Sequence, residues 1–260
     1  MASVSFPSIK PIKSLGQHFL CSRRIAEKLI DALEPLKKDV VIEVGAGGGF
    51  LTRLIARKAK KVIAVEIDKR FIEKLKNLSQ EYENIEVVEK DILEFDFKEN
   101  NVLIFGNLPY KISGPFIFWL LKKRKKFKRG VFTFQREFGE RLIAKRNTSS
   151  YGALSVIVQT FFNVKRLFYI PSFYFKPKPK VDSIVLRFIP KEKNLKVDEE
   201  LFIKMVKNSF SHRRKTLLNN LAKTTGLSRE EIKKFGIGEK TRPQELLPED
   251  YERLTHYISS

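Results

Sequence analysis

The chain contains 260 residues, of which 42% are hydrophobic and 31% are charged, a balance typical of a globular protein with a substantial core. No apolar run approaches the ~18 residues of a membrane-spanning helix. The single cysteine, Cys21, excludes an internal disulfide framework and a cysteine zinc site. Lysine and arginine outnumber aspartate and glutamate by 51 to 30, for a net charge of +21. This imbalance favours a polyanionic partner, nucleic acid first, over a surface that is merely rich in lysine.

Residues 1–24 form a basic arm that carries four lysine or arginine residues and no acidic residue. The arm lacks the continuous apolar stretch of a signal peptide, so a cytoplasmic protein is expected. After the arm, apolar residues at helical spacing predict a helix over 25–33.

From residue 40 onward, strand-like apolar runs alternate with amphipathic segments. Strands are predicted at 40–44, 61–67, 85–89, 102–105, 130–134, 168–170 and 183–189. Helices are predicted at 50–59, 69–79, 113–122, 137–145 and 151–162. Because the strands are rich in β-branched residues, this alternation predicts a doubly wound α/β fold with a mostly parallel sheet, whose last two strands form an antiparallel edge.

A polar, charged stretch at 190–198 predicts a domain boundary. It divides the chain into an α/β domain of residues 1–190, which includes the basic arm, and a small all-helical domain of residues 191–260. In the second domain, helices are predicted over 199–222 and 248–258, and a capping box at 228–231 opens a short helix between them.

The first candidate site is the glycine-rich stretch EVGAGGGFLT at 43–52, which follows a strand and precedes a helix. Gly45, Gly47 and Gly49 permit a tight turn and a close approach of a ligand to the backbone. On its own the signal is weak, because glycine turns are common in α/β proteins. Phe50 stands where the dinucleotide motif needs its third glycine or alanine, so the loop suits a nucleoside without a pyrophosphate better.

Three polar residues strengthen this reading. Glu66 ends the second strand, where an acid can accept hydrogen bonds from ribose hydroxyls, and Asp91 follows the third, where it can accept from an adenine amine. Either acid could instead cap a helix. Gly45, Glu66, Asp91 and Asn107 all fall at the carboxyl ends of strands, which share one edge of a parallel sheet. Ligands bind at that edge in open α/β sheets.

The stretch NLPY at 107–110 lies at the same edge. Asn107 can offer its side-chain oxygen to an exocyclic amine. Pro109 biases Leu108 towards an extended backbone, which leaves the carbonyl of Leu108 as a second acceptor. Tyr110 supplies a flat face for a base. A turn with a buried tyrosine is the alternative for this motif taken alone.

Taken in order, the motifs of the chain resemble those of the KsgA family of small-subunit ribosomal RNA adenine dimethyltransferases. The matching segments are GQHFL (16–20), EVGAGGGFLT (43–52), VEID (65–68), DILEFD (91–96), NLPYKIS (107–113), YGALSV (151–156), FKPKPKVDS (175–183) and FSHRRKTLLNNL (210–221). The resemblance implies a Rossmann-like class I methyltransferase domain with a mostly parallel seven-stranded sheet, followed by a small C-terminal helical domain.

The resemblance also implies the cofactor S-adenosylmethionine and the residues that serve it. The cofactor-binding residues it implies are His18, Leu20, Gly45, Gly47, Glu66, Asp91 and Asn107. For catalysis, Asn107 and Leu108 would accept hydrogen bonds from the N6 amine of adenine. Tyr110 and Phe175 would sandwich the flipped-out base. No metal is expected, since the three histidines show no metal-ligand spacing.

The implied reaction is dimethylation of N6 on two adjacent adenosines in the 3′-terminal hairpin of small-subunit RNA, within the immature small subunit. A monomer with no membrane partner is expected. Two alternatives stay open: a large-subunit RNA adenine methyltransferase of the macrolide-resistance type, and a non-catalytic RNA-binding assembly factor. The FKPKPKVDS and FSHRRK segments favour the small-subunit enzyme, and the intact NLPY motif argues against a loss of activity.

Affinity for RNA is expected from clusters of basic residues. The candidates are the N-terminal arm, the run KKRKKFKR at 122–129, the three lysines at 176, 178 and 180, and HRRK at 212–215. The run at 122–129 is equally consistent with a solvated helix end.

Overall fold

The computed structural model describes residues 11–12, 16–193, 195–212, 215–226 and 228–259. The chain divides into two compact units, one of residues 1–139 and 165–190 and the other of residues 140–164 and 191–260. The expected boundary near residue 190 coincides with one of the points at which the chain passes from one unit to the other. In addition, residues 140–164, which the sequence places in the α/β domain, group with the helical residues that follow 190.

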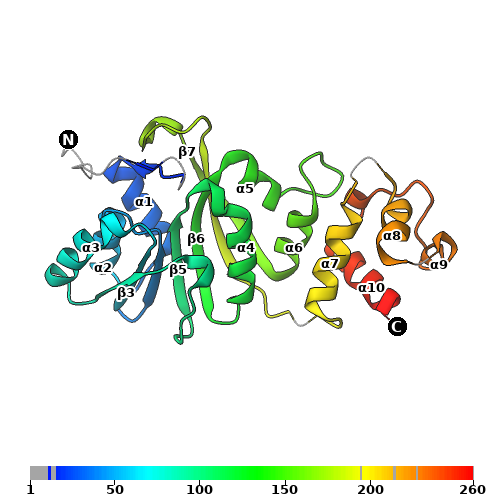
Figure 1. The fold of residues 1–260 in the computed structure, drawn as a ribbon, viewed down its shortest axis with the longest axis horizontal. Helices are drawn as coiled ribbons and strands as arrows, with labels where there is room; N and C mark the ends of the chain where they lie inside the picture. The colour runs from blue at the N-terminus through cyan, green and yellow to red at the C-terminus, as the bar shows by residue number, and fades with distance from the viewer. Residues whose placement is uncertain (1–10, 13–15, 194, 213–214, 227, 260) are drawn as a thin grey trace. The chain divides into compact units, whose positions relative to one another are not determined.

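The α/β unit is built on a seven-stranded sheet with the order β4-β3-β2-β5-β6-β9-β7 (Figure 1). The strands are β2 (Val40–Val44), β3 (Lys61–Glu66), β4 (Ile85–Glu89), β5 (Val102–Asn107), β6 (Phe127–Gln135), β7 (Phe162–Ile170) and β9 (Ser183–Pro190). The pairs from β4 to β6 are parallel, and β9 runs antiparallel to β6. The mostly parallel sheet is therefore confirmed, with β7 rather than β9 at its outer edge.

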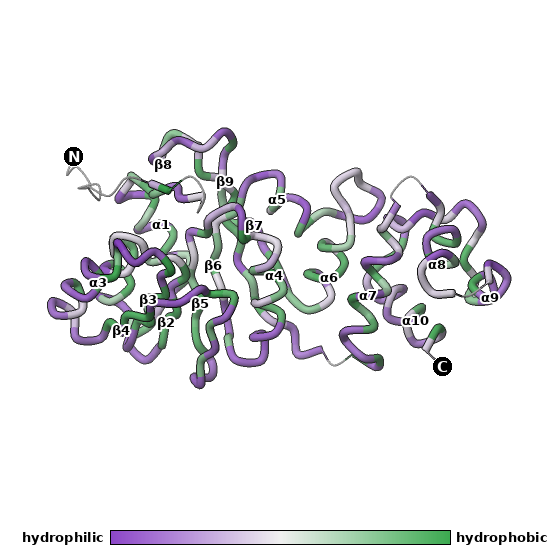
Figure 2. Tube along the Cα trace, in the orientation of Figure 1, coloured by the Kyte–Doolittle hydropathy of each residue, from purple (hydrophilic) through white to green (hydrophobic). Residues whose placement is uncertain are grey.

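Five helices accompany these strands: α1 (Arg23–Leu33), α2 (Phe50–Ala56), α3 (Lys69–Glu81), α4 (Ser113–Lys122) and α5 (Arg136–Leu142). The central strands are mostly apolar, as the green stretches near β2 and β5 in Figure 2 show, although β2 contains Glu43 and β5 ends at Asn107. Val41, Ile42 and Leu103 are fully buried, as expected for parallel strands that are covered on both faces.

A separate two-stranded sheet joins distant parts of this unit. β1 (Phe19–Leu20) pairs antiparallel with β8 (Phe175–Lys176), and Leu20 lies opposite Phe175. The N–H of Cys21 extends the contact by donating to the Tyr174 carbonyl at 2.8 Å. Strands of two residues carry no periodic pattern, so the sequence could not predict them. The pairing fixes the segment that holds the GQHFL motif against the α/β unit.

The helical unit contains α6 (Ala153–Phe161), α7 (Glu199–Ser209), α8 (Leu217–Thr225), α9 (Arg229–Lys233) and α10 (Pro248–Ser259). The capping box of Ser228 and Glu231 at the start of α9 is confirmed. The single helix predicted over 199–222 is wrong, because α7 ends at Ser209 and α8 begins at Leu217. Among the described residues, no helix combines the length and apolar character needed to span a membrane.

The break between α7 and α8 has a clear physical cause. The buried side-chain amide of Asn220 donates to the backbone carbonyls of Ser209, at 2.6 Å, and His212, at 3.1 Å. The Thr216 hydroxyl caps α8 by accepting from the Asn219 N–H. The apolar spacing continues through α8, with Leu217, Leu218 and Leu221 buried, and this continuity is what made two helices look like one.

Replacing Asn220 with alanine is expected to lower the free energy of unfolding by about 2–3 kcal/mol, because the buried carbonyl of Ser209 and the partly buried carbonyl of His212 lose their donor. Urea denaturation followed by circular dichroism measures this change. The matched control is Asn219→Ala, since Asn219 lies next to it on α8 with an exposed side chain. Equal stability losses in the two variants would show that the amide of Asn220 does not hold the break.

Candidate active site

A cavity of about 220 Å³ opens at the carboxyl ends of the central strands. Its lining includes Gly45 after β2, Glu66 at the end of β3, Asp91 after β4 and Asn107 at the end of β5. The four residues that the sequence places at one edge of the sheet therefore share one cavity. The remaining lining residues are Gln17, His18, Phe19, Val44, Gly47, Val65, Ile67, Lys90, Ile92, Pro109, Lys111 and Ile112.

The glycine loop needs its glycines at two positions. Gly47 has φ +53°, and a Cβ there would lie 3.4 Å from the ring of Phe19. Gly49 has φ +80° at the start of α2, and a Cβ there would lie 2.8 Å from the Leu78 side chain. Other residues rarely adopt these backbone angles. The loop can thus turn tightly and leave its backbone open to a ligand.

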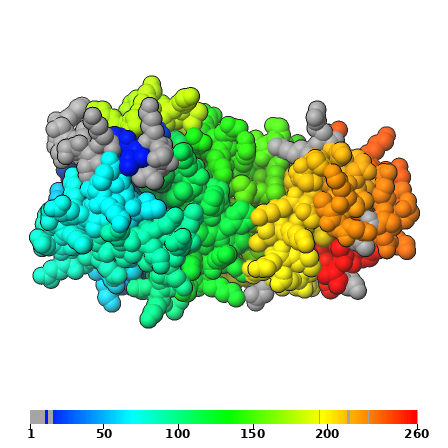
Figure 3. All heavy atoms as spheres, viewed as in Figure 1, coloured from blue at the N-terminus to red at the C-terminus, as the bar shows by residue number. Residues whose placement is uncertain are grey.

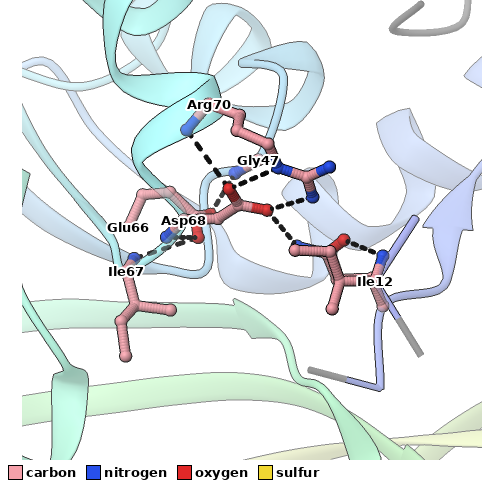
Figure 4. Close-up of polar contacts among 7 residues, drawn as sticks. Ile12, Gly47, Glu66, Ile67, Asp68 and Arg70 are labelled. Atoms are coloured by element: carbon pink, nitrogen blue, oxygen red, sulfur yellow. Dashed lines mark hydrogen bonds and ion pairs between the residues drawn. The ribbon is translucent and has the colours of Figure 1, made fainter. Parts of the chain in front are cut away.

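Glu66 holds this loop in place (Figure 4). Its carboxylate accepts hydrogen bonds from the N–H of Gly47 at 2.6 Å, of Asp68 at 2.9 Å and of Ile67 at 3.0 Å. The side chain is almost fully buried, and this burial raises the pKa of Glu66 above its usual value. A carboxylate oxygen has more than one lone pair, so Glu66 can also accept from a pair of hydroxyls in the cavity.

Asp68 ties the N-terminal segment to this rim, a contact that the sequence did not reveal. The Arg70 guanidinium bonds both of its carboxylate oxygens, at 2.9 and 2.6 Å, and holds the pKa of Asp68 low, at about 2. The Gln17 amide donates to Asp68 at 2.8 Å and accepts from the Ile12 N–H at 2.9 Å (Figure 4). In Figure 3 the blue N-terminal residues lie against the cyan surface that follows β3.

Asn107 has both ends of its side-chain amide engaged. Its Nδ2 donates to the His18 carbonyl at 3.2 Å, and its Oδ1 accepts from the Thr133 hydroxyl at 2.6 Å. The next residue, Leu108, has its side chain buried. Pro109 follows with an extended backbone and lines the cavity. The motif therefore places at the edge of the cavity a residue, Asn107, whose amide is held at both ends.

Tyr110 is half-buried beside the cavity. Its hydroxyl shares a 2.8 Å hydrogen bond with the Ser183 hydroxyl, and burial raises the pKa of the phenol. The rings of Tyr110 and His18 are 5.2 Å apart between centroids and inclined by 33°. The Nδ1 of His18 lies 2.6 Å from the Pro177 carbonyl, so this nitrogen carries a proton and donates.

Four predicted site residues are not among those that line the cavity: Leu20, Leu108, Tyr110 and Phe175. Leu20 and Phe175 are 5% and 2% exposed and belong to one apolar cluster beneath the β1–β8 pair. Stacking of Phe175 on a base would require its ring to leave that cluster. Phe19, which the sequence did not single out, lines the cavity in place of Leu20. Asp91 lines the cavity and also caps the following turn, since its Oδ1 accepts from the Leu93 N–H at 2.9 Å.

Sequence reasoning also missed Glu43, two residues before the glycine loop. Its side chain is 1% exposed, and its Oε2 has no hydrogen-bond partner among the described residues. Burial, with the nearby charge of Glu66, raises the pKa of Glu43 to about 8. An acid in an otherwise apolar strand is the signal that could have identified it. At neutral pH the folded protein therefore holds Glu43 largely protonated.

This protonation predicts a pH dependence of stability. In the folded state the pKa of Glu43 is about 8 against an ordinary value of 4.5, so between these pH values only the folded state binds the proton, and stability falls as pH rises. Glu43→Gln cannot titrate. Its stability relative to wild type is expected to increase from pH 5 to pH 9, by up to about 5 kcal/mol.

Urea denaturation at pH 5, 7 and 9 measures the effect. The exposed Glu83→Gln serves as the control for replacing a glutamate by glutamine outside the core. A stability difference between Glu43→Gln and wild type that stays constant with pH would mean that Glu43 is ionised in the folded protein.

The described residues contain no group of three or more histidine, cysteine, aspartate or glutamate side chains placed to hold a metal ion.

The family described as ribosomal RNA adenine dimethylase matches residues 10–260. Ribosomal RNA small subunit methyltransferase A of Clostridium acetobutylicum is 38% identical, covering 95% of this chain and 93% of that protein. Its namesake in Alkaliphilus metalliredigens is 36% identical, covering 95% of this chain and 92% of that protein.

Among solved structures, a dimethyladenosine transferase from Plasmodium falciparum superposes with a TM-score of 0.81 at 30% identity, covering 91% of this chain and 96% of the other. The 23S ribosomal RNA methyltransferase ErmE superposes with a TM-score of 0.71 at 24% identity, a likeness of fold. With a family match over nearly its whole length and relatives above 35% identity, the chain belongs to the ribosomal RNA adenine dimethylases.

Proposed function

We propose that the protein uses S-adenosylmethionine to dimethylate N6 of two adjacent adenosines in the 3′-terminal hairpin of small-subunit ribosomal RNA. The observation that carries the proposal is the position of Asn107. This residue lines the cavity together with Glu66 and Asp91, and it begins the NLPY motif, which ends at Tyr110. The side chain that we propose as an acceptor for the target amine would therefore lie next to the bound cofactor. The relatives named above support the choice of the small subunit.

The residues present fit this cofactor. Glu66, oriented by three backbone N–H groups, would accept from the two ribose hydroxyls, and Asp91 would accept from the adenine amine of the cofactor. The glycine loop lets the ligand approach the backbone at Gly45 and Gly47. When bound, S-adenosylmethionine supplies a methyl group that is already activated by its sulfonium.

The protein's task is then to prepare a weak nucleophile. The lone pair of the adenine amine is delocalised into its ring. The Asn107 Oδ1 and the Leu108 carbonyl would accept its two protons in hydrogen bonds, which favours a pyramidal nitrogen and aims the lone pair at the methyl group. Such positioning can supply several kcal/mol of the barrier. The amine nitrogen would then form its bond to the methyl carbon as the bond from that carbon to the sulfonium breaks, which leaves a neutral thioether. No covalent enzyme intermediate is needed, and the amine would lose one proton to solvent after the transfer.

The target base must leave its stack to enter this site. Tyr110 offers the face on which it would stack, and stacking on an aromatic ring contributes about 1–3 kcal/mol per base. His18 lies beside that ring in the present structure, so it would border the bound base.

RNA contacts are assigned to the three lysines at 176, 178 and 180, whose side chains are exposed. The run at 122–129 is partly used within the fold: Lys123 and Lys126 pair with Asp96, and Lys128 pairs with Asp39 at 2.7 Å. Of the other basic residues proposed for RNA binding, Lys10, Lys13, Arg213 and Arg214 lie outside the described residues. Arg23 and Arg24, in α1, and His212 and Lys215, between α7 and α8, are exposed. We assign the enzyme to the cytoplasm as a monomer.

Transfer of labelled methyl groups to small subunits from a strain that lacks this modification tests the proposal. Primer extension on both ribosomal RNAs then locates the product. Dimethyladenosine in the 3′-terminal hairpin of the small-subunit RNA is expected. Product on large-subunit RNA would favour the macrolide-resistance type of enzyme. Binding without methyl transfer would favour the non-catalytic assembly factor.

A further inference from the structure

A buried threonine stands directly behind the amide of Asn107. Thr133 lies on β6 opposite Asn107 of β5 and is 1% exposed. Its Oγ1 lies 2.6 Å from the Asn107 Oδ1. The other acceptor near this hydroxyl, the Gly106 carbonyl, is 3.5 Å away, too far for a strong hydrogen bond. Thr133 does not line the cavity, so it can influence the reaction only through Asn107.

The contacts of Asn107 determine which way its amide faces. A backbone carbonyl can only accept a hydrogen bond, so the group 3.2 Å from the His18 carbonyl must be the NH₂ of Asn107. The oxygen of the amide then faces Thr133, and the threonine hydroxyl is the donor. With this bond made, Oδ1 keeps a second lone pair for another donor.

We propose that Thr133 is a positioning residue for methyl transfer, which it serves by locking the Asn107 amide with its oxygen available to the target amine. This inference rests on the function proposed above. Without the Thr133 hydroxyl, Oδ1 loses its internal donor and the amide can rotate or flip. A flipped amide presents NH₂ to the amine of the base, which repels it and leaves the amine with the Leu108 carbonyl alone as an acceptor.

The bond also explains why a polar side chain occupies this buried position. Thr133 stands between Phe132 and Phe134 in the sequence of β6, and it pairs with Val185 of the neighbouring strand β9. Phe132, Phe134 and Val185 are fully buried. Valine has nearly the same shape as threonine and would fill the same space. The hydroxyl is therefore needed for the bond to Asn107 rather than for packing.

The test compares Thr133→Val, which removes the hydroxyl, with Thr133→Ser, which keeps it. For Thr133→Val we expect kcat to fall about 10- to 100-fold, as for other small losses of positioning, with KM values for cofactor and RNA within about 2-fold of wild type. Thr133→Ser should recover most of the wild-type kcat. Thr160→Val is the matched control, because Thr160 is equally buried and donates to the Val156 carbonyl in the helical unit.

A measurement without turnover reports on the Asn107 amide directly, in Thr133→Val samples whose NMR spectrum is that of the folded protein. The Asn107 side-chain NH₂ signals in nitrogen-15 NMR are assigned by their loss in Asn107→Ala. They should show faster rotation of the whole amide about the Cβ–Cγ bond in Thr133→Val than in wild type or Thr133→Ser. Unchanged rotation or unchanged kcat in Thr133→Val would overturn the proposal, as would a Thr133→Ser variant that is no better than Thr133→Val.

Asn107→Ala is assayed alongside, so that failure of the role of Thr133 can be told from failure of the proposed function. If Asn107→Ala is inactive while Thr133→Val is fully active, only the role of Thr133 fails. If wild type transfers no methyl group to RNA, the proposed function fails first.

Discussion

Asn107→Ala is expected to lower kcat for methyl transfer by about 10²–10³-fold, which corresponds to about 2.7–4 kcal/mol of lost transition-state stabilisation. The physical reason is that the amide oxygen acts on the amine as it becomes pyramidal, which happens only as the methyl group is transferred. Affinity for RNA should change little, since Asn107 carries no charge. Single-turnover transfer of a labelled methyl group to undermethylated small subunits, with filter binding of the RNA, measures both quantities.

The control for this variant is Asn100→Ala, because Asn100 has an exposed side chain in the loop that precedes β5. Its kcat should equal that of wild type. Asn107→Asp adds information, since an aspartate keeps an oxygen towards Thr133 but brings a second oxygen against the His18 carbonyl. Full turnover in Asn107→Ala would remove Asn107 from the mechanism and leave the Leu108 carbonyl as the acceptor of the target amine.

Glu66→Ala is expected to weaken binding of S-adenosylmethionine by at least about 10²-fold, because hydrogen bonds to a charged group contribute about 1.5–3 kcal/mol each. Two effects add in this variant. The ribose loses its acceptor, and the N–H groups of Gly47, Ile67 and Asp68 lose the carboxylate that orients them. Isothermal titration calorimetry measures the dissociation constant directly.

The pH dependence of this binding follows from the raised pKa of Glu66. Ribose hydroxyls need the ionised carboxylate as their acceptor, so affinity should be full above that pKa and should fall as pH drops through it. Because the pKa is raised, this loss begins at a higher pH than for an ordinary glutamate. Glu89→Ala provides the control, since Glu89 ends the neighbouring strand β4 with an exposed side chain. An unaltered dissociation constant in Glu66→Ala would exclude the ribose contact.

Most of the α/β fold could be predicted because its signals are local. The strands β2 to β6 are apolar runs between turn residues, and parallel strands place their carboxyl ends at one edge. That rule brought Gly45, Glu66, Asp91 and Asn107 together in advance, and they do line one cavity. The break between α7 and α8 could not be predicted, because the helical spacing of apolar residues continues through it. The hydrogen bonds of the Asn220 amide stabilise the break, and they are not visible in the sequence.

The contacts that complete the site depend on residues far apart in the chain. Thr133 is an ordinary strand residue in the sequence, and only the register of β6 against β5 brings it to Asn107. Gln17 meets Asp68, and Leu20 meets Phe175, across long separations. The motif that contains Phe175 predicts a ring that stacks on the base. In the structure, Phe175 pairs with Leu20 and its ring packs in the core. Motifs therefore identified the region, whereas tertiary contacts decided the role of each side chain.

The short pairing of β1 with β8 also sets an order of events during synthesis. Residues 17–19, which line the cavity, emerge from the ribosome early. Their partner strand β8, formed by Phe175 and Lys176, emerges late. A nascent chain or a fragment that stops before β8 lacks that partner strand, although β2 to β5 are all present. Full cofactor affinity is therefore expected only in chains that extend beyond residue 176, long after the glycine loop has been synthesised.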